Sequence, residues 1–210
     1  MTQNFLFDGP ESADATFLLA HGAGAPMDSP AMTMLAAALA GAGLRVARFE
    51  FAYMSARRSG ARKPPPKAET LIPEYLAAVD ALAAQAPLII GGKSMGGRVA
   101  SMVADDLYAT GRAAGLLCIG YPFHPVSKPQ ALRTAHLADL RMPTLIAQGT
   151  RDPFGTREEV AAYALSKTIE ILWLEDGDHD LRPRKSMSGF TQKEHLASMA
   201  REVLKWTKNL

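Results

Sequence analysis

The 210-residue sequence has almost no cysteine, since its one thiol is Cys118 in the apolar run AGLLCIG. A lone cysteine cannot form an internal disulfide or a cysteine-based metal cluster, so we expect a reducing compartment. Long apolar runs are also missing, because no stretch approaches the roughly 20 residues of a membrane-spanning helix. The N-terminal MTQNFLFDGPES lacks the basic and apolar regions of a signal peptide. These absences predict a cytoplasmic protein without a membrane partner.

An excess of charge of one sign is absent as well. Lys and Arg number 23 against 21 Asp and Glu, and a net charge of +2 gives no reason to expect a nucleic-acid partner. Apolar residues make up 48% of the chain, which is typical of a folded protein. The sequence shows no internal repeat and no Ser/Gly linker. We therefore expect a single domain over residues 1–210.

Short apolar runs alternate along the chain with longer helical patterns, as they do in a parallel sheet with crossover helices. Strands are expected at 15–21, 44–51, 87–92, 113–120, 142–149 and 168–175. Helices are expected at 31–43, 69–86, 95–111, 156–166 and 192–208. A seventh, antiparallel strand near Phe5–Phe7 would extend the sheet. The pattern predicts an α/β fold of six to seven mostly parallel strands with helices on both faces.

Residues 89–98 read IIGGKSMGGR, where Gly-Lys-Ser could belong to a phosphate-binding loop or to a turn that presents a nucleophile. A phosphate-binding loop requires a glycine five residues before Gly92, but that position is Pro87 and a strand lies between them. The pattern G-x-S-x-G fits Gly92–Gly96 between a strand and a helix. Side chains two residues either side of the serine would collide in so tight a turn. The two glycines therefore favour Ser94 as a nucleophile.

A nucleophilic serine needs a base, and the base needs an acid that orients it. Asp152 follows the strand at 142–149 and His179 follows the next strand, which gives the order Ser, Asp, His known for one class of triad. Because carboxyl ends of parallel strands share an edge, we expect Ser94, Asp152 and His179 to converge there. The acids around the histidine are interpreted as loop-shaping or solvated residues: Asp176, Asp178 and Asp180.

An oxyanion hole should complete such a site. One donor is expected to be the backbone N–H of Met95, the residue after the nucleophile. The second is expected from LLAHGAGAP, where the N–H of Ala23 is the candidate, although a glycine-rich turn without catalytic duty would look the same. Other candidates for the substrate pocket are His21, Gly22, Arg57, Arg58 and His124. Met27, Met54 and Met95 could also line it, although methionines are more often core fillers.

The remaining charged and imidazole groups have simpler interpretations. His136 and His195 lie in helical-looking segments and are expected to be structural or exposed. Lys93 is part of the tight turn and is expected to face away from Ser94. Two basic stretches leave strands at the same edge: Arg57, Arg58, Arg62, Lys63 and Lys67, and then Arg182, Arg184 and Lys185. They could attract anionic acyl substrates, but the residues alone favour ordinary solvated loops around Pro64–Pro66.

The segments HGAGAPMDSP, GGKSMGGR, GYPFHP and QGTRDPFG resemble those of α/β-hydrolases, and the likeness runs from about residue 15 to the end. They are similar to one branch that groups predicted bacterial hydrolases, related to dienelactone hydrolases, with the hydrolase-like domain of a subunit of the NSL histone-acetyltransferase complex. The resemblance implies a site of Ser94, His179 and Asp152 without a metal or organic cofactor. Only about twenty residues follow GYPFHP before the next strand, so no cap domain is expected.

We therefore expect a serine hydrolase that acts on a small acyl ester or thioester through an acyl-enzyme intermediate. A catalytically silent binding or scaffold protein of the same fold is the alternative, although a scaffold would need none of the three triad residues. An acyltransferase with the same triad is a further alternative that the sequence does not separate from a hydrolase. The sequence also leaves the physiological substrate and the oligomeric state undetermined.

Overall fold

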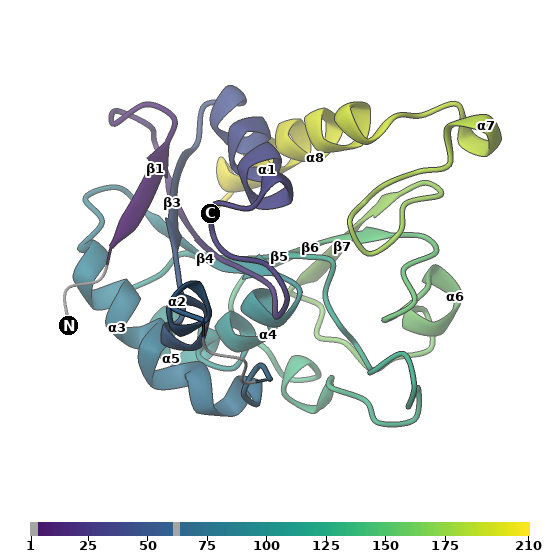
Figure 1. Ribbon diagram of the computed structural model, residues 1–210, viewed down its shortest axis with the longest axis horizontal. Helices are drawn as coiled ribbons and strands as arrows, with labels where there is room; N and C mark the ends of the chain where they lie inside the picture. The colour runs from purple at the N-terminus through teal and green to yellow at the C-terminus, as the bar shows by residue number, and fades with distance from the viewer. Residues whose placement is uncertain (1–3, 61–63) are drawn as a thin grey trace.

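The computed structural model of the protein describes residues 4–60 and 64–210. Its centre is a seven-stranded sheet in the order β1-β3-β2-β4-β5-β6-β7 (Figure 1). The strands are β1 (Phe5–Asp8), β2 (Thr16–Ala20), β3 (Arg45–Phe49), β4 (Leu88–Lys93), β5 (Gly115–Ile119), β6 (Thr144–Gly149) and β7 (Ile169–Leu174). Strands β2 to β7 are parallel, and β1 pairs antiparallel with β3. The six expected parallel strands and the antiparallel one are confirmed.

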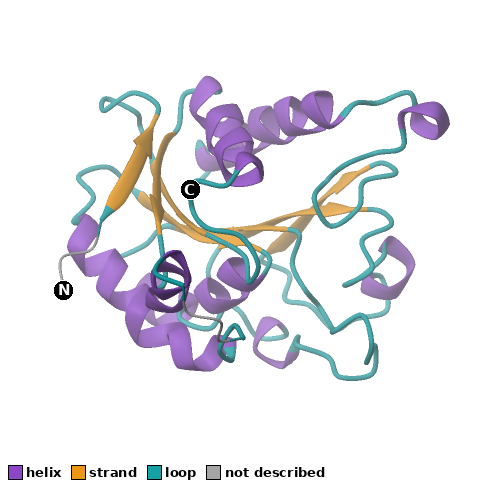
Figure 2. Ribbon diagram, in the orientation of Figure 1, coloured by secondary structure: helices purple, strands orange, loops and turns teal. Residues whose placement is uncertain are grey.

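Helices cover both faces of this sheet (Figure 2). One face carries α1 (Pro30–Gly41) and α8 (Gln192–Thr207), and the other carries α3 (Ile72–Leu82), α4 (Met95–Ser101) and α5 (Ala104–Ala109). The remaining helical segments are short: α2 (Ala52–Arg58), η1 (Ala68–Leu71), η2 (Ala135–Leu137), α6 (Arg157–Val160) and α7 (Lys185–Ser188). The expected α/β architecture is therefore confirmed.

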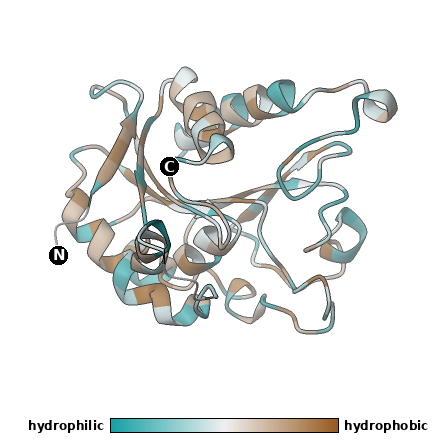
Figure 3. Ribbon diagram, in the orientation of Figure 1, coloured by the Kyte–Doolittle hydropathy of each residue, from teal (hydrophilic) through white to brown (hydrophobic). Residues whose placement is uncertain are grey.

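The alternation of side chains along each strand divides the core in two. In β2, Leu18 packs into the cluster under α3 and α4, whereas its neighbours Phe17 and Leu19 pack into the cluster under α1 and α8. Figure 3 shows hydrophobic residues in the central strands and more hydrophilic ones along much of α8. The expected inner face of the last helix is confirmed, because all four residues expected there are buried: Leu196, Met199, Val203 and Trp206.

Several helix boundaries differ from the sequence-based expectation. The helix expected at 95–111 is broken into α4 and α5, and the Ser101 hydroxyl donates to the Arg98 carbonyl oxygen at the break (2.8 Å). Such a side-chain bond competes with the helical backbone bonds. The helix expected at 69–86 begins as η1 and ends where Ala83 adopts a left-handed conformation. The helix expected at 156–166 is only α6, and the segment before residue 60 forms α2 rather than a loop.

The connection between β5 and β6 carries no cap domain. Its one helical element is the single turn η2, although this is where many related folds insert a further domain. The carboxyl edge of the sheet is therefore left without a cover over its central strands. In the described part of the chain, no helix is both long and apolar enough to cross a membrane.

Tyr75 of α3 supports the strand that leads to Ser94. Its buried hydroxyl accepts a hydrogen bond from the Gly91 N–H (2.7 Å) and donates to the Gly91 carbonyl oxygen (3.0 Å). Gly91 has a φ of 155°, and a β-carbon there would lie 1.8 Å from the Leu117 carbonyl oxygen, so only glycine fits. The tyrosine thus satisfies backbone groups of a distorted residue in the middle of the sheet.

Tyr75→Phe should lower the free energy of unfolding by about 1–3 kcal/mol, because it leaves buried polar groups of Gly91 without a partner. Urea denaturation would measure this loss. Tyr108→Phe, at an exposed residue of α5, is the matched control and should change stability by less than about 0.5 kcal/mol. Equal stability of the two variants would show that the Tyr75 hydroxyl contributes nothing.

Candidate active site

Ser94 occupies the tight turn between β4 and α4. Its φ of 52° and ψ of −116° lie in a region that residues with a β-carbon rarely adopt. Such strain persists only where the surroundings fix it. Here the Ser94 N–H donates to the Ile119 carbonyl oxygen of β5 (2.9 Å), and the Ser94 carbonyl oxygen accepts from the Arg98 N–H (3.0 Å). The turn holds the serine side chain at the carboxyl edge of the sheet.

The two glycines that flank the turn allow it to approach the end of β2. A β-carbon on Gly92 would lie 2.6 Å from the Ala20 carbonyl oxygen. One on Gly96 would lie 2.6 Å from the same oxygen and 2.7 Å from the His21 carbonyl oxygen. We expected such side chains to collide with the serine, but the closest collisions are with the backbone of the neighbouring strand. Glycine is therefore required at positions 92 and 96 because the turn packs closely against the backbone at the end of β2.

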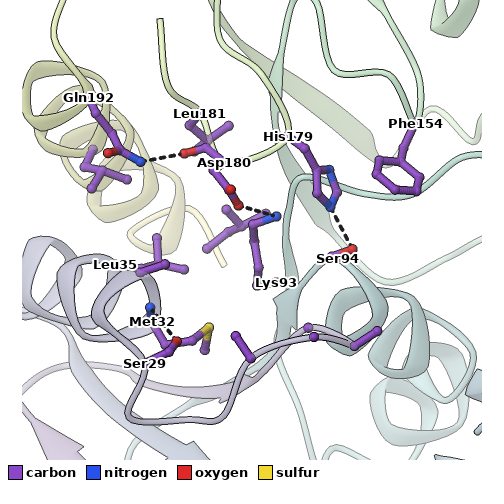
Figure 4. Close-up of a pocket in the computed structure, with 17 residues that line it drawn as sticks. Ser29, Met32, Leu35, Lys93, Ser94, Phe154, His179, Asp180, Leu181 and Gln192 are labelled. Atoms are coloured by element: carbon purple, nitrogen blue, oxygen red, sulfur yellow. Dashed lines mark hydrogen bonds and ion pairs between the residues drawn. The ribbon is translucent and has the colours of Figure 1, made fainter. Parts of the chain in front are cut away.

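The structure brings together the three side chains that the sequence singled out. His179 Nε2 lies 2.8 Å from Ser94 Oγ, and His179 Nδ1 lies 2.8 Å from Asp152 Oδ2. Because a carboxylate only accepts, Nδ1 carries the proton and Nε2 is free to accept from the serine hydroxyl. The Phe154 ring packs against the imidazole, with 4.4 Å between ring centroids. Figure 4 shows His179 directed at Ser94.

Asp152 is fully buried and its carboxylate is held by three groups. Oδ1 accepts from the Phe154 N–H (2.9 Å), and Oδ2 accepts from Gln148 Nε2 (3.0 Å) as well as from His179. Gln148 also accepts from the Tyr121 N–H through Oε1 (2.7 Å), which fixes its amide orientation. Sequence reasoning missed Gln148. The feature that could have identified it is a lone amide side chain inside the apolar strand TLIAQG, four residues before Asp152.

The loop after β2 lies beside Ser94, and the side chains of His21 and Tyr53 hold its backbone. The His21 ring accepts from the Phe51 N–H through Nε2 (3.1 Å) and so donates through Nδ1 to the Gly22 carbonyl oxygen (2.7 Å). Burial lowers the pKa of His21, which favours this neutral form. The Tyr53 hydroxyl donates to the Ala23 carbonyl oxygen (3.1 Å), and burial raises the pKa of Tyr53 to about 12. The loop backbone is thereby fixed.

The two amides expected to form an oxyanion hole flank the serine. Met95 begins α4 directly after Ser94, and Ala23 lines the same cavity as the serine. Within residues 4–60 and 64–210, neither amide donates to a backbone carbonyl outside its own element. An N–H group at the first position of a helix has no partner within that helix. The Met95 amide thus has no helical partner, as an oxyanion donor requires, and the Ala23 amide stays a prediction.

A cavity of about 330 Å³ opens next to Ser94 and His179, between α1 and α8 (Figure 4). Its walls are mainly apolar, and their side chains come from four parts of the chain: Met32, Leu35, Ile119, Leu181 and Leu196. Gly22 and Ala23 form one side of it. The cavity has the composition and the position of a binding site for a small organic group.

Several residues expected in the pocket lie elsewhere. His21 is buried beneath the loop, and His124 is buried with its Nε2 3.5 Å from Glu159 Oε2. The backbone of Met27 is held by Glu50 and Arg48, outside the cavity wall. The other two expected methionines, Met54 and Met95, are buried in the core.

The two arginines expected at the pocket are engaged by other groups. Arg58 pairs with Asp28 and Glu50 at 2.7 Å each, so its charge is balanced. Arg57 packs over the Tyr53 ring, with its guanidinium carbon 5.4 Å from the ring centroid. Arg184 likewise pairs with Asp176. Arg62 and Lys63 lie outside the described residues. These contacts are those of ordinary solvated loops, which the residues alone favour, and the attraction of anionic substrates stays a prediction.

Lys93 departs from its expected orientation. Its side chain lines the cavity, with Nζ 3.4 Å from Asp180 Oδ1, instead of facing away from the serine. The loop-shaping interpretation of the other two acids agrees with their contacts. Asp176 accepts from the Arg184 N–H (2.6 Å), and Asp178 accepts from the Arg182 N–H (2.9 Å).

The other two histidines have structural partners. His136 lies 2.8 Å from Ser101 Oγ through Nε2. His195 is buried, and its Nδ1 lies 3.0 Å from the Leu181 carbonyl oxygen. Among the residues that the structure describes, no group of three or more His, Cys, Asp or Glu side chains is placed to hold a metal ion.

Residues 13–208 match the model of a family described as an alpha/beta hydrolase domain. A dienelactone hydrolase from Anabaena variabilis has a similar structure, with a TM-score of 0.72 and 21% identity over 99% of this chain and 91% of that one. An esterase domain from Rhodothermus marinus has a TM-score of 0.67 and 19% identity over 100% and 99%. A serine hydrolase without a lid from Xanthomonas campestris has a TM-score of 0.66 and 19% identity over 97% and 89%.

At these identities the solved structures establish the fold, whereas the family model covers nearly the whole chain. The fold, the family match and the lidless sheet edge agree with one another. The chain belongs to the α/β-hydrolase family.

Proposed function

We propose that the protein is a serine hydrolase in which Ser94, His179 and Asp152 form the catalytic triad. The observation that carries the proposal is the continuous chain of hydrogen bonds from Ser94 Oγ through His179 to the buried Asp152. A strained serine, an imidazole placed between serine and carboxylate, and a fixed carboxylate are what an activated nucleophile needs. A catalytically silent scaffold of the same fold has no use for this arrangement.

The reaction would proceed through an acyl-enzyme. Ser94 Oγ attacks the acyl carbonyl while His179 Nε2 accepts its proton, and Asp152 stabilises the imidazolium that results. The N–H groups of Ala23 and Met95 stabilise the oxyanion. His179 then returns the proton to the leaving group, and a water molecule, activated by the same nitrogen, releases the acid. An acyltransferase would differ only in the acceptor that replaces this water.

The cavity favours a small acyl group over a long chain or a peptide. It encloses about 330 Å³, its walls are mainly apolar, and no cap domain extends it. Esters and thioesters of short acids fit these limits.

Cys118 is a buried free thiol, which supports the proposal that the protein works in the reducing cytoplasm. The segments HGAGAPMDSP and GYPFHP further support placement in the branch shared with the NSL-complex subunit.

A fluorophosphonate probe tests the proposal directly, because it reacts with activated serines. Mass spectrometry should find the adduct on Ser94 of the wild type and no adduct in Ser94→Ala. His179→Ala should label at least about a hundredfold more slowly, since the general base contributes on the order of 10²–10⁴ in rate. The exposed Ser186 of α7 is the control, and Ser186→Ala should label like the wild type. A folded wild type that stays unlabelled would contradict the proposal and favour the scaffold.

Gln148→Met should lower kcat for a short ester by about tenfold to a hundredfold, because a hydrogen bond to a charged group contributes about 1.5–3 kcal/mol. The KM should stay nearly constant, since Gln148 does not line the cavity. The pH profile of kcat is a second readout, because a mere loss of folded protein would lower kcat by the same factor at every pH.

Gln85→Met is the matched control for this change. Gln85 is exposed and its amide donates only to the Ala83 carbonyl oxygen (3.2 Å). Its kinetic parameters should equal those of the wild type. If Gln148→Met kept the wild-type kcat and pH profile, the glutamine would have no part in positioning Asp152.

A further inference from the structure

One ion pair interrupts the mainly apolar wall of the cavity. Lys93 Nζ lies 3.4 Å from Asp180 Oδ1, and both residues line the cavity with Ser94 and His179. The Lys93 side chain is 14% exposed and the Asp180 side chain is 55% exposed. Figure 4 shows the pair between the serine and histidine on one side and Leu181 and Leu35 on the other. The mechanism proposed above assigns no role to either residue.

The pair has unused hydrogen-bonding capacity. An ammonium group has three donors and a carboxylate has about four acceptor sites. For residues 4–60 and 64–210, Asp180 is the one side-chain partner of the Lys93 ammonium, and Lys93 is the one partner of the Asp180 carboxylate. Their separation of 3.4 Å also exceeds the roughly 2.7–2.9 Å of a tight charge-assisted hydrogen bond. A ligand group could therefore bind to both.

The pair lies close to the reacting centre. Lys93 directly precedes the nucleophile in the chain. A β-carbon placed on Gly120 would lie 3.1 Å from Lys93 Nζ and 3.3 Å from His179 Nδ1, so both nitrogens border the same point. A substituent near the carbonyl of a bound acyl group would reach the pair, whereas a substituent several bonds further along would meet Leu35 or Leu196.

We propose that Lys93 and Asp180 determine substrate specificity by binding a neutral hydroxyl group on the acyl chain, close to its carbonyl carbon. The hydroxyl oxygen would accept from Lys93, and the hydroxyl hydrogen would be donated to Asp180. This inference rests on the proposed hydrolase function, because it assumes that the cavity holds the acyl group. It names hydroxy-acyl esters as the preferred substrate class.

An anionic substituent fits this pair poorly. Asp180 balances the charge of Lys93, so the pair offers no net positive charge. Burial lowers the pKa of Lys93, although the nearby Asp180 and Asp152 oppose that effect. Loss of the lysine proton would leave the pair negative, so in neither protonation state does it attract a carboxylate. A hydroxyl group loses less on leaving water than a carboxylate does and uses both partners.

Three esters of similar size test the proposal: ethyl butanoate, ethyl 3-hydroxybutanoate as each enantiomer, and monoethyl succinate. For the wild type, kcat/KM should be about tenfold higher for one hydroxylated enantiomer than for the butanoate, as expected for hydrogen bonds to charged groups. The value of kcat/KM should be lowest for monoethyl succinate. Release of acid, measured at constant pH, follows all of them without a chromophore.

Two substitutions separate the partners. Asp180→Asn removes the negative charge and should raise kcat/KM for the succinate by about tenfold relative to the butanoate. Lys93→Met removes the donor and should abolish the preference for the hydroxylated ester. Lys205→Met is the control, because Lys205 pairs with Glu202 on the outer face of α8. Lys205→Met should leave the ratios of kcat/KM between the esters unchanged. Asp180→Asn should also lower the preference for the hydroxylated ester, because the acceptor loses its charge. Asp180 is half exposed, so this result decides the matter even if Lys93→Met does not fold.

Binding to Ser94→Ala separates this proposal from the hydrolase function. Ligand-observed NMR titration of the three esters would give their relative affinities without turnover. Tighter binding of a hydroxylated enantiomer would support the proposed pair even if the wild type hydrolysed none of them, in which case the hydrolase function alone would fail. Equal affinities of the hydroxylated ester and the butanoate, or a preference for the succinate, would overturn the proposed hydroxyl-binding role of Lys93 and Asp180.

Discussion

The close approach of the Ser94 turn to the end of β2 is the contact on which the rest of the site depends. Gly92 and Gly96 have no β-carbon, and the Ala20 carbonyl oxygen fills the space where one would lie. Because β2 continues directly into the loop with Ala23, the same contact sets nucleophile and loop side by side. A β-carbon on Gly22 would lie 3.6 Å from that of Ser94. One backbone packing requirement thus fixes both the nucleophile and a candidate oxyanion donor.

The positions of His179 and Asp152 depend on a second close approach, between the end of β6 and the loop after β7. A β-carbon on Gly149 would lie 2.2 Å from the Gly177 carbonyl oxygen, so the two loops touch through their backbones. The Thr150 hydroxyl accepts from the Asp176 N–H (2.8 Å), and Arg151 Nε donates to the Asp176 carbonyl oxygen (2.7 Å). These bonds hold Asp152 and His179 in one arrangement.

The strands and the convergence of the three polar residues could be predicted from the sequence because both follow from periodic, local signals. Apolar runs mark buried strands, and parallel strands place their carboxyl ends at one edge. Gln148 could not be predicted, because an amide in a strand points to either face until the register is known. The orientation of Lys93 depends on the distorted turn that follows it, and the break after Ser101 depends on one side-chain bond.

We propose that one edge of the sheet gathers a nucleophile, its base and two amide donors around a single reacting atom. The most direct measurement is a crystal structure of the protein after reaction with a small fluorophosphonate. We expect phosphorus on Ser94 Oγ and a phosphoryl oxygen about 2.7–3.1 Å from the backbone nitrogens of both Ala23 and Met95. An adduct on another residue, or a phosphoryl oxygen directed away from these amides, would contradict it.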